Sequence, residues 1–285
     1  MAKSAMLPTR KEVINRYGPP LAPVVISRLP VFAPVDRRKP VERTVSQKKP
    51  WGEVSVTGRL TQLHRSLLDA AIATALKWRA TEDGGVLLVC DPYRIKRLMV
   101  TKSWDYRWLE SLLEDLRRAR VRILENGHEF PLVVTGVVTS YGRFAKQRLL
   151  QPGRLSHRSD DRRDMIYLMI SAEWWSMWRD QVLVHYAEVL PEIGRLSGLG
   201  QAVVRLCLTQ QPGWHIGVDH VLRAVGAIVA GAVGPAARKR RQRARWDLRA
   251  DAEGLRRVGV EVEGDTITYH PPAGTYISVP ARPEA

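Results

Sequence analysis

The stretch that decides the fold is Pro235-Ala-Ala-Arg-Lys-Arg-Arg-Gln-Arg-Ala-Arg-Trp246. Proline is tolerated in the first turn of a helix, and alanine, arginine and glutamine are good helix formers. We therefore predict a helix that begins at Pro235 and reaches about Arg257. Residues 238–249 hold seven basic residues against a single acid, Asp247. A helix with so much positive charge is unusual, so we interpret the segments around it by their position relative to this helix.

This basic helix has the chemistry of a DNA-contacting element. A helix N-terminus already offers free N–H donors and positive potential to a phosphate. Arginine can also grip guanine with two hydrogen bonds, and glutamine can do the same with adenine. The candidate DNA-binding residues here are Arg238, Lys239, Arg240, Arg241, Gln242, Arg243, Arg245 and Arg249. Trp246 and Leu248 are expected to anchor the helix. A solvated charged face and a localisation signal are the alternatives.

The segments on either side of the basic helix give it a place in a domain. Apolar spacing predicts helices over 193–208 and 218–225 before it. Short strands over 260–262 and 266–269, joined at Gly264-Asp265, predict a hairpin after it. Two helices, a third helix and a hairpin form a winged helix. We therefore assign residues 181–285 to a winged-helix domain whose third helix is the basic one.

The same order is predicted once more upstream. Residues 57–78 have helical apolar spacing, Asp91-Pro92 begins a second helix over 93–99, and Ser103 can cap a third. Strands over 121–124 and 130–140, joined through an Asn-Gly turn, give a hairpin. Residues 51–180 are therefore assigned to a first winged-helix domain. It would include a long wing loop over 143–163, a returning strand over 165–170 and a connecting helix over 171–185.

Two groups of residues are candidate DNA contacts in this first domain. Lys102, Ser103, Tyr106 and Arg107 would point outward at the start of the third helix, where they could donate to phosphates or base edges. An ordinary amphipathic core helix is the alternative. Basic residues of the wing loop form the second group, and those we select are Arg143, Lys146 and Arg148. A loop without a binding role is the alternative for these three.

Residues 1–50 differ in composition from the rest of the chain. They contain eight prolines and eleven lysines or arginines against three acids. Proline at this density opposes helices and central strands, and the charge opposes collapse. We predict a flexible basic N-terminal arm that precedes the two domains. The arm would track phosphates, bind a partner or serve only as a solubilising leader.

Bulk composition narrows the class of partner. The formal net charge is +16, which makes the surface attractive to polyanions. No apolar run is long enough to span a membrane and no signal peptide opens the chain, so a membrane role is not expected. Arginine outnumbers lysine, which favours nucleic acid over lipid. The expected location is the bacterial cytoplasm, in association with the nucleoid or a plasmid.

The sequence offers no set of residues for catalysis. Cys90 and Cys207 stand far apart, and the histidines have no metal-ligand spacing. No phosphate-binding Gly-rich loop and no acidic cluster of a two-metal nuclease is found. We therefore expect a non-enzymatic protein with no cofactor and no metal. The tryptophans mostly fall in helical apolar stripes, so core packing is their expected role rather than base stacking.

The Arg238-Lys-Arg-Arg-Gln-Arg-Ala-Arg block, with Leu248, Leu255 and Pro272-Ala-Gly274 after it, resembles the C-terminal module of plasmid replication initiators. The match is most similar to the initiators of IncQ-type plasmids. Over residues 57–125 the resemblance is one of pattern. It implies two tandem winged helices that bind directly repeated sites, called iterons, in double-stranded DNA, open the origin and load a replicative helicase. It also implies a possible homodimer in a repressing form.

Other functions stay open at this level. A winged-helix transcriptional repressor with a copy-control role is the first alternative, and it would prefer inverted repeats. A relaxase-type enzyme and an RNA-binding protein are less favoured. Missing metal-binding histidines weigh against the relaxase, and the narrow groove of duplex RNA weighs against the RNA-binding protein.

Overall fold

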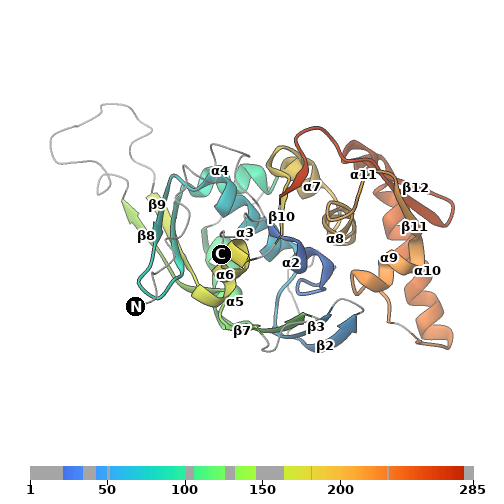
Figure 1. Cartoon of the computed structure of the whole chain (residues 1–285), viewed down its shortest axis with the longest axis horizontal. Helices are drawn as coiled ribbons and strands as arrows, with labels where there is room; N and C mark the ends of the chain where they lie inside the picture. Colours follow the sequence, from blue (N-terminus) through green and yellow to red (C-terminus); the bar gives the residue numbers. More distant parts are fainter. Residues whose placement is uncertain are drawn as a thin grey trace, which may run out of the picture.

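The computed structural model describes residues 22–34, 43–49, 52–100, 106–125, 132–145, 164–180, 182–229 and 231–278. Over these ranges the chain is a mixed α+β protein with four small antiparallel sheets (Figure 1), so the predicted α+β class is confirmed. The N-terminal half contains the two larger sheets. The C-terminal half, residues 182–278 at the right of Figure 1, is mostly helical and has a β-hairpin and a last short strand near its end.

Two four-stranded sheets build the N-terminal half. The first has the order β2-β3-β6-β7, from Arg43–Lys49, Gly52–Gly58, Arg120–Glu125 and Leu132–Thr135. The second has the order β4-β5-β9-β8, from Lys77–Ala80, Val86–Cys90, Asp164–Ile170 and Val138–Ala145. Four helices accompany them: α3 (Gln62–Thr74), α4 (Pro92–Leu98), α5 (Tyr106–Arg118) and α6 (Ala172–Asp180).

The helix predicted over 57–78 is shorter than expected. Residues 52–58 form strand β3, in which Val54 and Val56 are buried and alternate with less buried polar residues. This alternation has the period of a strand, and it ends at Gly58, whose φ is 132°. Helix α3 begins after Thr61, whose backbone N–H donates to His64 Nδ1 at 3.1 Å. At its other end Trp78 belongs to strand β4.

The hairpin predicted over 121–140 is correct only in its first part. Strands β6 and β7 do pair in antiparallel fashion. The second predicted strand breaks at Gly136, whose φ is 81°, and a Cβ there would lie 2.8 Å from the Arg117 carbonyl oxygen. After the break, β8 leaves this sheet and pairs with β9. The predicted winged helix has three helices and one hairpin. The N-terminal half therefore contains more β-sheet than was predicted.

The C-terminal half follows its predicted order more closely. A 3₁₀ turn (Ala187–Val189) and α7 (Leu190–Arg195) lead to α8 (Gly198–Cys207), so the helix predicted over 193–208 is divided where Ser197 caps α8. Then come β11 (Trp214–Gly217), α9 (Val218–Ala224), α10 (Pro235–Ala250), α11 (Ala252–Arg257), β12 (Val260–Glu263) and β13 (Thr266–Tyr269). The hairpin of β12 and β13 is confirmed, and β11 joins it in the order β11-β13-β12.

The prediction of a flexible arm over residues 1–50 is wrong for the part that the structure describes. Strand β1 (Ala22–Pro23) pairs with β10 (Leu183–His185), which also pairs with β14 (Tyr276–Ser278). Helix α2 (Val24–Arg28) and the segment after it bury Val25, Ile26 and Phe32. Prolines here flank a short helix instead of interrupting it, and the apolar residues between them enter the core. The connecting helix predicted over 171–185 is also shorter than expected. Helix α6 ends at Asp180, and residues 183–185 form strand β10.

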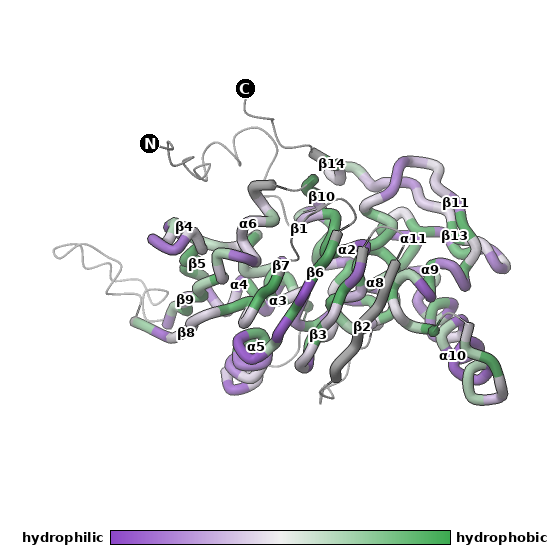
Figure 2. Tube along the Cα trace, turned by 60° about the horizontal axis from the view of Figure 1, so that its bottom comes forward, coloured by the Kyte–Doolittle hydropathy of each residue, from purple (hydrophilic) through white to green (hydrophobic). Residues whose placement is uncertain are grey.

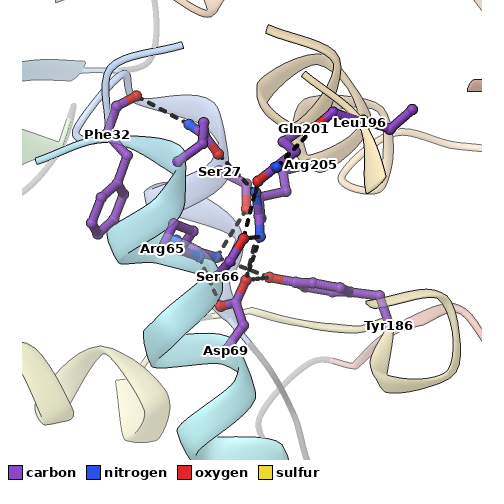
Figure 3. Close-up of polar contacts among 10 residues, drawn as sticks. Ser27, Phe32, Arg65, Ser66, Asp69, Tyr186, Leu196, Gln201 and Arg205 are labelled. Carbon is purple, nitrogen blue, oxygen red and sulfur yellow. Dashed lines mark hydrogen bonds and ion pairs between the residues drawn. The ribbon is translucent and has the colours of Figure 1, made fainter. Parts of the chain in front are cut away.

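A buried polar network joins the two halves where α3 packs against α8 (Figure 3). Asp69 on α3 accepts from Arg65 Nε at 2.8 Å, from Arg205 Nη2 on α8 at 3.0 Å, and from the Tyr186 hydroxyl at 2.8 Å. Arg205 also donates to Ser66 Oγ and to the side-chain oxygens of Gln62 and Gln201. Both arginines are only 3% exposed. One continuous apolar core surrounds them, with residues from both halves.

Candidate nucleic-acid interface

Helix α10 is held to the rest of the molecule along one side only. Ala244 and Leu248 are its buried residues, and they face the neighbouring helices of the C-terminal half. In Figure 2 the helix lies at the lower right and extends away from the other elements. Gly234 precedes it with a φ of 98°, and Pro235 occupies its first turn as predicted. The helix thus presents most of its circumference to solvent.

Two of the predicted DNA-contacting arginines are bound to acids of the chain itself. Arg245 Nε donates to Asp219 Oδ1 on α9 at 2.8 Å, and Arg245 Nη1 donates to Asp265 Oδ1 in the β12–β13 turn at 2.8 Å. Arg241 Nε lies 3.6 Å from Asp219 Oδ2. The hydrogen bond from Arg245 lowers the pKa of Asp219 below its usual value. These guanidinium groups fasten α10 to α9 and to the hairpin.

The remaining candidate residues of α10 form its exposed side. They are the polar side chains of α10 that are exposed and have no ion-pair partner in the described part of the chain: Arg238, Lys239, Arg240, Gln242, Arg243 and Arg249. Five of these six are basic, and none of the five makes an ion pair with a residue in the described part of the chain. Asp247, the one acid of the helix, is half-buried. The exposed side therefore carries concentrated, uncompensated positive charge.

Sequence reasoning missed how α10 divides between these two roles. Asp219 and Asp265 lie in other elements, and only the folded chain brings them to the helix. The helical spacing of positions 238, 241, 245 and 249 could place them on one side, but it could not tell which were matched by acids. Trp246 was expected to anchor the helix, and this was wrong, since its side chain is 69% exposed.

The candidate residues of the first half are only partly described. Lys102, Ser103, Lys146 and Arg148 lie outside the described residues. Tyr106 begins α5 but does not point outward, because its hydroxyl group is buried without a hydrogen-bond partner. Burial raises the pKa of this phenol. Arg107 is exposed one residue later.

Arg143 is the candidate from the predicted wing loop that the structure describes, and it lies on strand β8. Its guanidinium carbon is 3.9 Å from the centre of the Tyr106 ring, and its Nη2 is 3.4 Å from Glu110 Oε1. The structure therefore brings two separately predicted residues into contact. These contacts tie β8 to the start of α5, so both partners of Arg143 are structural ones on that helix.

Other kinds of site are not found among the described residues. They contain no cluster of three or more histidine, cysteine or acidic side chains that could hold a metal ion. Both cysteines are buried, and burial raises the pKa of Cys90 to about 12. None of the described helices has both the length and the apolar character to cross a membrane.

The chain matches no protein-family model, no curated protein and no solved structure.

Proposed function

We propose that the chain is a DNA-binding protein, rather than an enzyme, and that it contacts double-stranded DNA through the exposed side of α10. The observation that carries this proposal is the row of basic residues there that no described acid neutralises. A protein binds duplex DNA chiefly by neutralising phosphates, and arginine adds paired hydrogen bonds to guanine. Gln242 lies among these arginines and can pair with adenine in the same way.

The arrangement around α10 supports its role as the groove-contacting element. Helix α8, strand β11, helices α9 and α10, the short helix α11 and the β12–β13 hairpin follow one another, and β11 pairs with β13. This is the order expected of a winged helix, in which the third helix enters the major groove. Asp219 and Asp265 add to it, because they hold Arg245 and thereby orient the helix on its support.

The biological role that fits this site best is that of a plasmid replication initiator acting on direct repeats at an origin. The resemblance of the Arg238–Arg245 block supports this role, and helicase recruitment and a repressing homodimer rest on that resemblance alone. A copy-control repressor with the same DNA-binding helix is the second candidate. The two differ in the symmetry of their sites, because a symmetric dimer reads inverted half-sites.

Footprinting on the DNA that flanks the gene tests the proposal. We expect protection of several sites repeated in one orientation. The double variant Arg240→Ala/Arg243→Ala should lose this protection, and the matched double variant Arg79→Ala/Arg94→Ala should keep it. Protection of a single inverted repeat would favour the repressor. Equal protection by both variants would remove α10 from the binding site.

A further inference from the structure

Among the described tryptophans, Trp246 alone is exposed to solvent. The other described tryptophans are buried or half-buried, whereas Trp246 is 69% exposed. It lies in the fourth turn of α10, three residues after Arg243 and three before Arg249, so it shares the exposed side with both. The buried stripe of Ala244 and Leu248 is on the other side of the helix. A large indole thus stands in solvent between two unpaired guanidinium groups.

The surroundings of Trp246 narrow the class of partner that would cover it. Tryptophan and arginine are both enriched at protein–protein interfaces, so these residue types alone do not select the partner. The unpaired positive charge on both sides of Trp246 favours a polyanion over a protein surface. A paired base in duplex DNA offers its edge to a groove, while its faces are covered by neighbouring bases. An unpaired base offers its face, and aromatic side chains flanked by cations are the usual platform for single strands.

We propose that Trp246 stacks on an unpaired base, so that the exposed side of α10 also binds single-stranded DNA. Arg243 and Arg249 lie about one turn before and after the indole, roughly 5 Å along the helix, and they neutralise the phosphates on either side of the stacked base. This inference rests on the proposed function, because both use the positive charge of α10. It adds single-stranded DNA as a second ligand, and it assigns Trp246 to binding of the single strand but not of the duplex.

The test compares two probes with three proteins. The probes are a fluorescein-labelled oligo-dT strand of 20 nucleotides and a random-sequence duplex of the same length, at low salt, with binding followed by fluorescence anisotropy. The proteins are the full chain and its Trp246→Ala and Trp246→Phe variants. Since Trp246 is exposed, neither variant should change the thermal unfolding midpoint, and this is checked first.

We expect Trp246→Ala to weaken binding of the single strand by about 5- to 150-fold, the range that loss of one stacked base gives. Trp246→Phe should restore most of that affinity, and binding of the duplex should change by less than about twofold for either variant. Unchanged binding of the single strand by Trp246→Ala overturns the inference and leaves the proposed function standing. Equal weakening for both probes also overturns it. Absence of duplex binding by the full chain overturns the proposed function itself.

Discussion

At the scale of single residues, two similar arginines only two positions apart on α10 have different tasks. Arg245 is held by Asp219 and Asp265, while Arg243 has no acidic partner in the described structure. From the amino-acid sequence both are expected to bind DNA, because both belong to the same basic segment over 238–249. Their roles separate only when α9 and the hairpin bring carboxylates to one side of the helix. This division makes Asp219 a residue that limits how much charge α10 offers to DNA.

Replacing Asp219 should therefore change stability and DNA binding in opposite directions. Asp219→Asn frees Arg241 and leaves Arg245 paired with Asp265 alone, so duplex binding at low salt should tighten. The free energy of unfolding should fall by about 1 kcal/mol, the upper range for a partly exposed ion pair. Asp247→Asn makes the same charge change on α10 itself and is the matched control. A similar tightening in both variants would mean that net charge alone is responsible.

The same ion pair should give a measurable pH dependence. Arg245 holds the pKa of Asp219 below its usual value, so the folded chain binds this proton more weakly than the unfolded chain. The stabilisation is complete above the unfolded pKa, near 3.9, and is lost as the pH falls through the lower folded pKa. Urea unfolding between pH 5 and 2.5 should show a shallower acid loss for Asp219→Asn than for the unaltered chain. Identical pH profiles would contradict the pairing.

Asp69 is the buried residue with the largest expected effect. Its carboxylate faces Arg65 and Arg205, and all three side chains are nearly inaccessible. Asp69→Asn would leave two buried guanidinium groups without their anion, which costs about 3–5 kcal/mol in comparable pairs. Chemical denaturation measures this, with exposed Asp164→Asn as the control. A loss below 1 kcal/mol would show that the network contributes little to joining the halves.

At the scale of elements, the sequence predicts best where one local signal acts alone. The basic helix and the β12–β13 hairpin were found because proline begins one and Gly264-Asp265 turns the other. The prediction of one strand over 130–140 was wrong because the chain passes from one sheet to another at Gly136. The alternation of apolar and polar residues does not show that change of sheet. Partner strands distant in sequence decide such cases.

The segment around Phe32 gives the clearest test of the corrected N-terminal description. Its ring packs edge-to-face on Trp174 at 6.1 Å, and its carbonyl accepts from Gln62 Nε2. Phe32→Ala should lower the free energy of unfolding by about 3–5 kcal/mol, as in other cores. Val233→Ala, at a side chain that is 92% exposed, should leave it unchanged. An unaltered midpoint for Phe32→Ala would restore the view of a loose arm.

At the scale of the whole molecule, the N-terminal segment, both halves and the last strand form one structure. Strands β1, β10 and β14 come from three distant parts of the chain and make one sheet. Composition could not predict this, because the proline content that suggested an arm says nothing of the apolar residues between the prolines. The basic residues of α10 could be predicted individually. That five of them stay exposed and unpaired, while Arg241 and Arg245 meet acids from other elements, follows only from the assembled fold.

The salt dependence of duplex binding tests the central claim most directly. The measurement is the slope of log Kd against log salt concentration for a random-sequence duplex. The variant Arg238→Ala/Lys239→Ala/Arg240→Ala/Arg243→Ala should reduce that slope by up to about 3.6, since each phosphate contact contributes roughly 0.9. The control Lys77→Ala/Arg79→Ala/Arg94→Ala/Arg97→Ala removes the same charge from β4 and α4 and should reduce it by less than about 1. Equal slopes for the two variants would contradict DNA binding by α10.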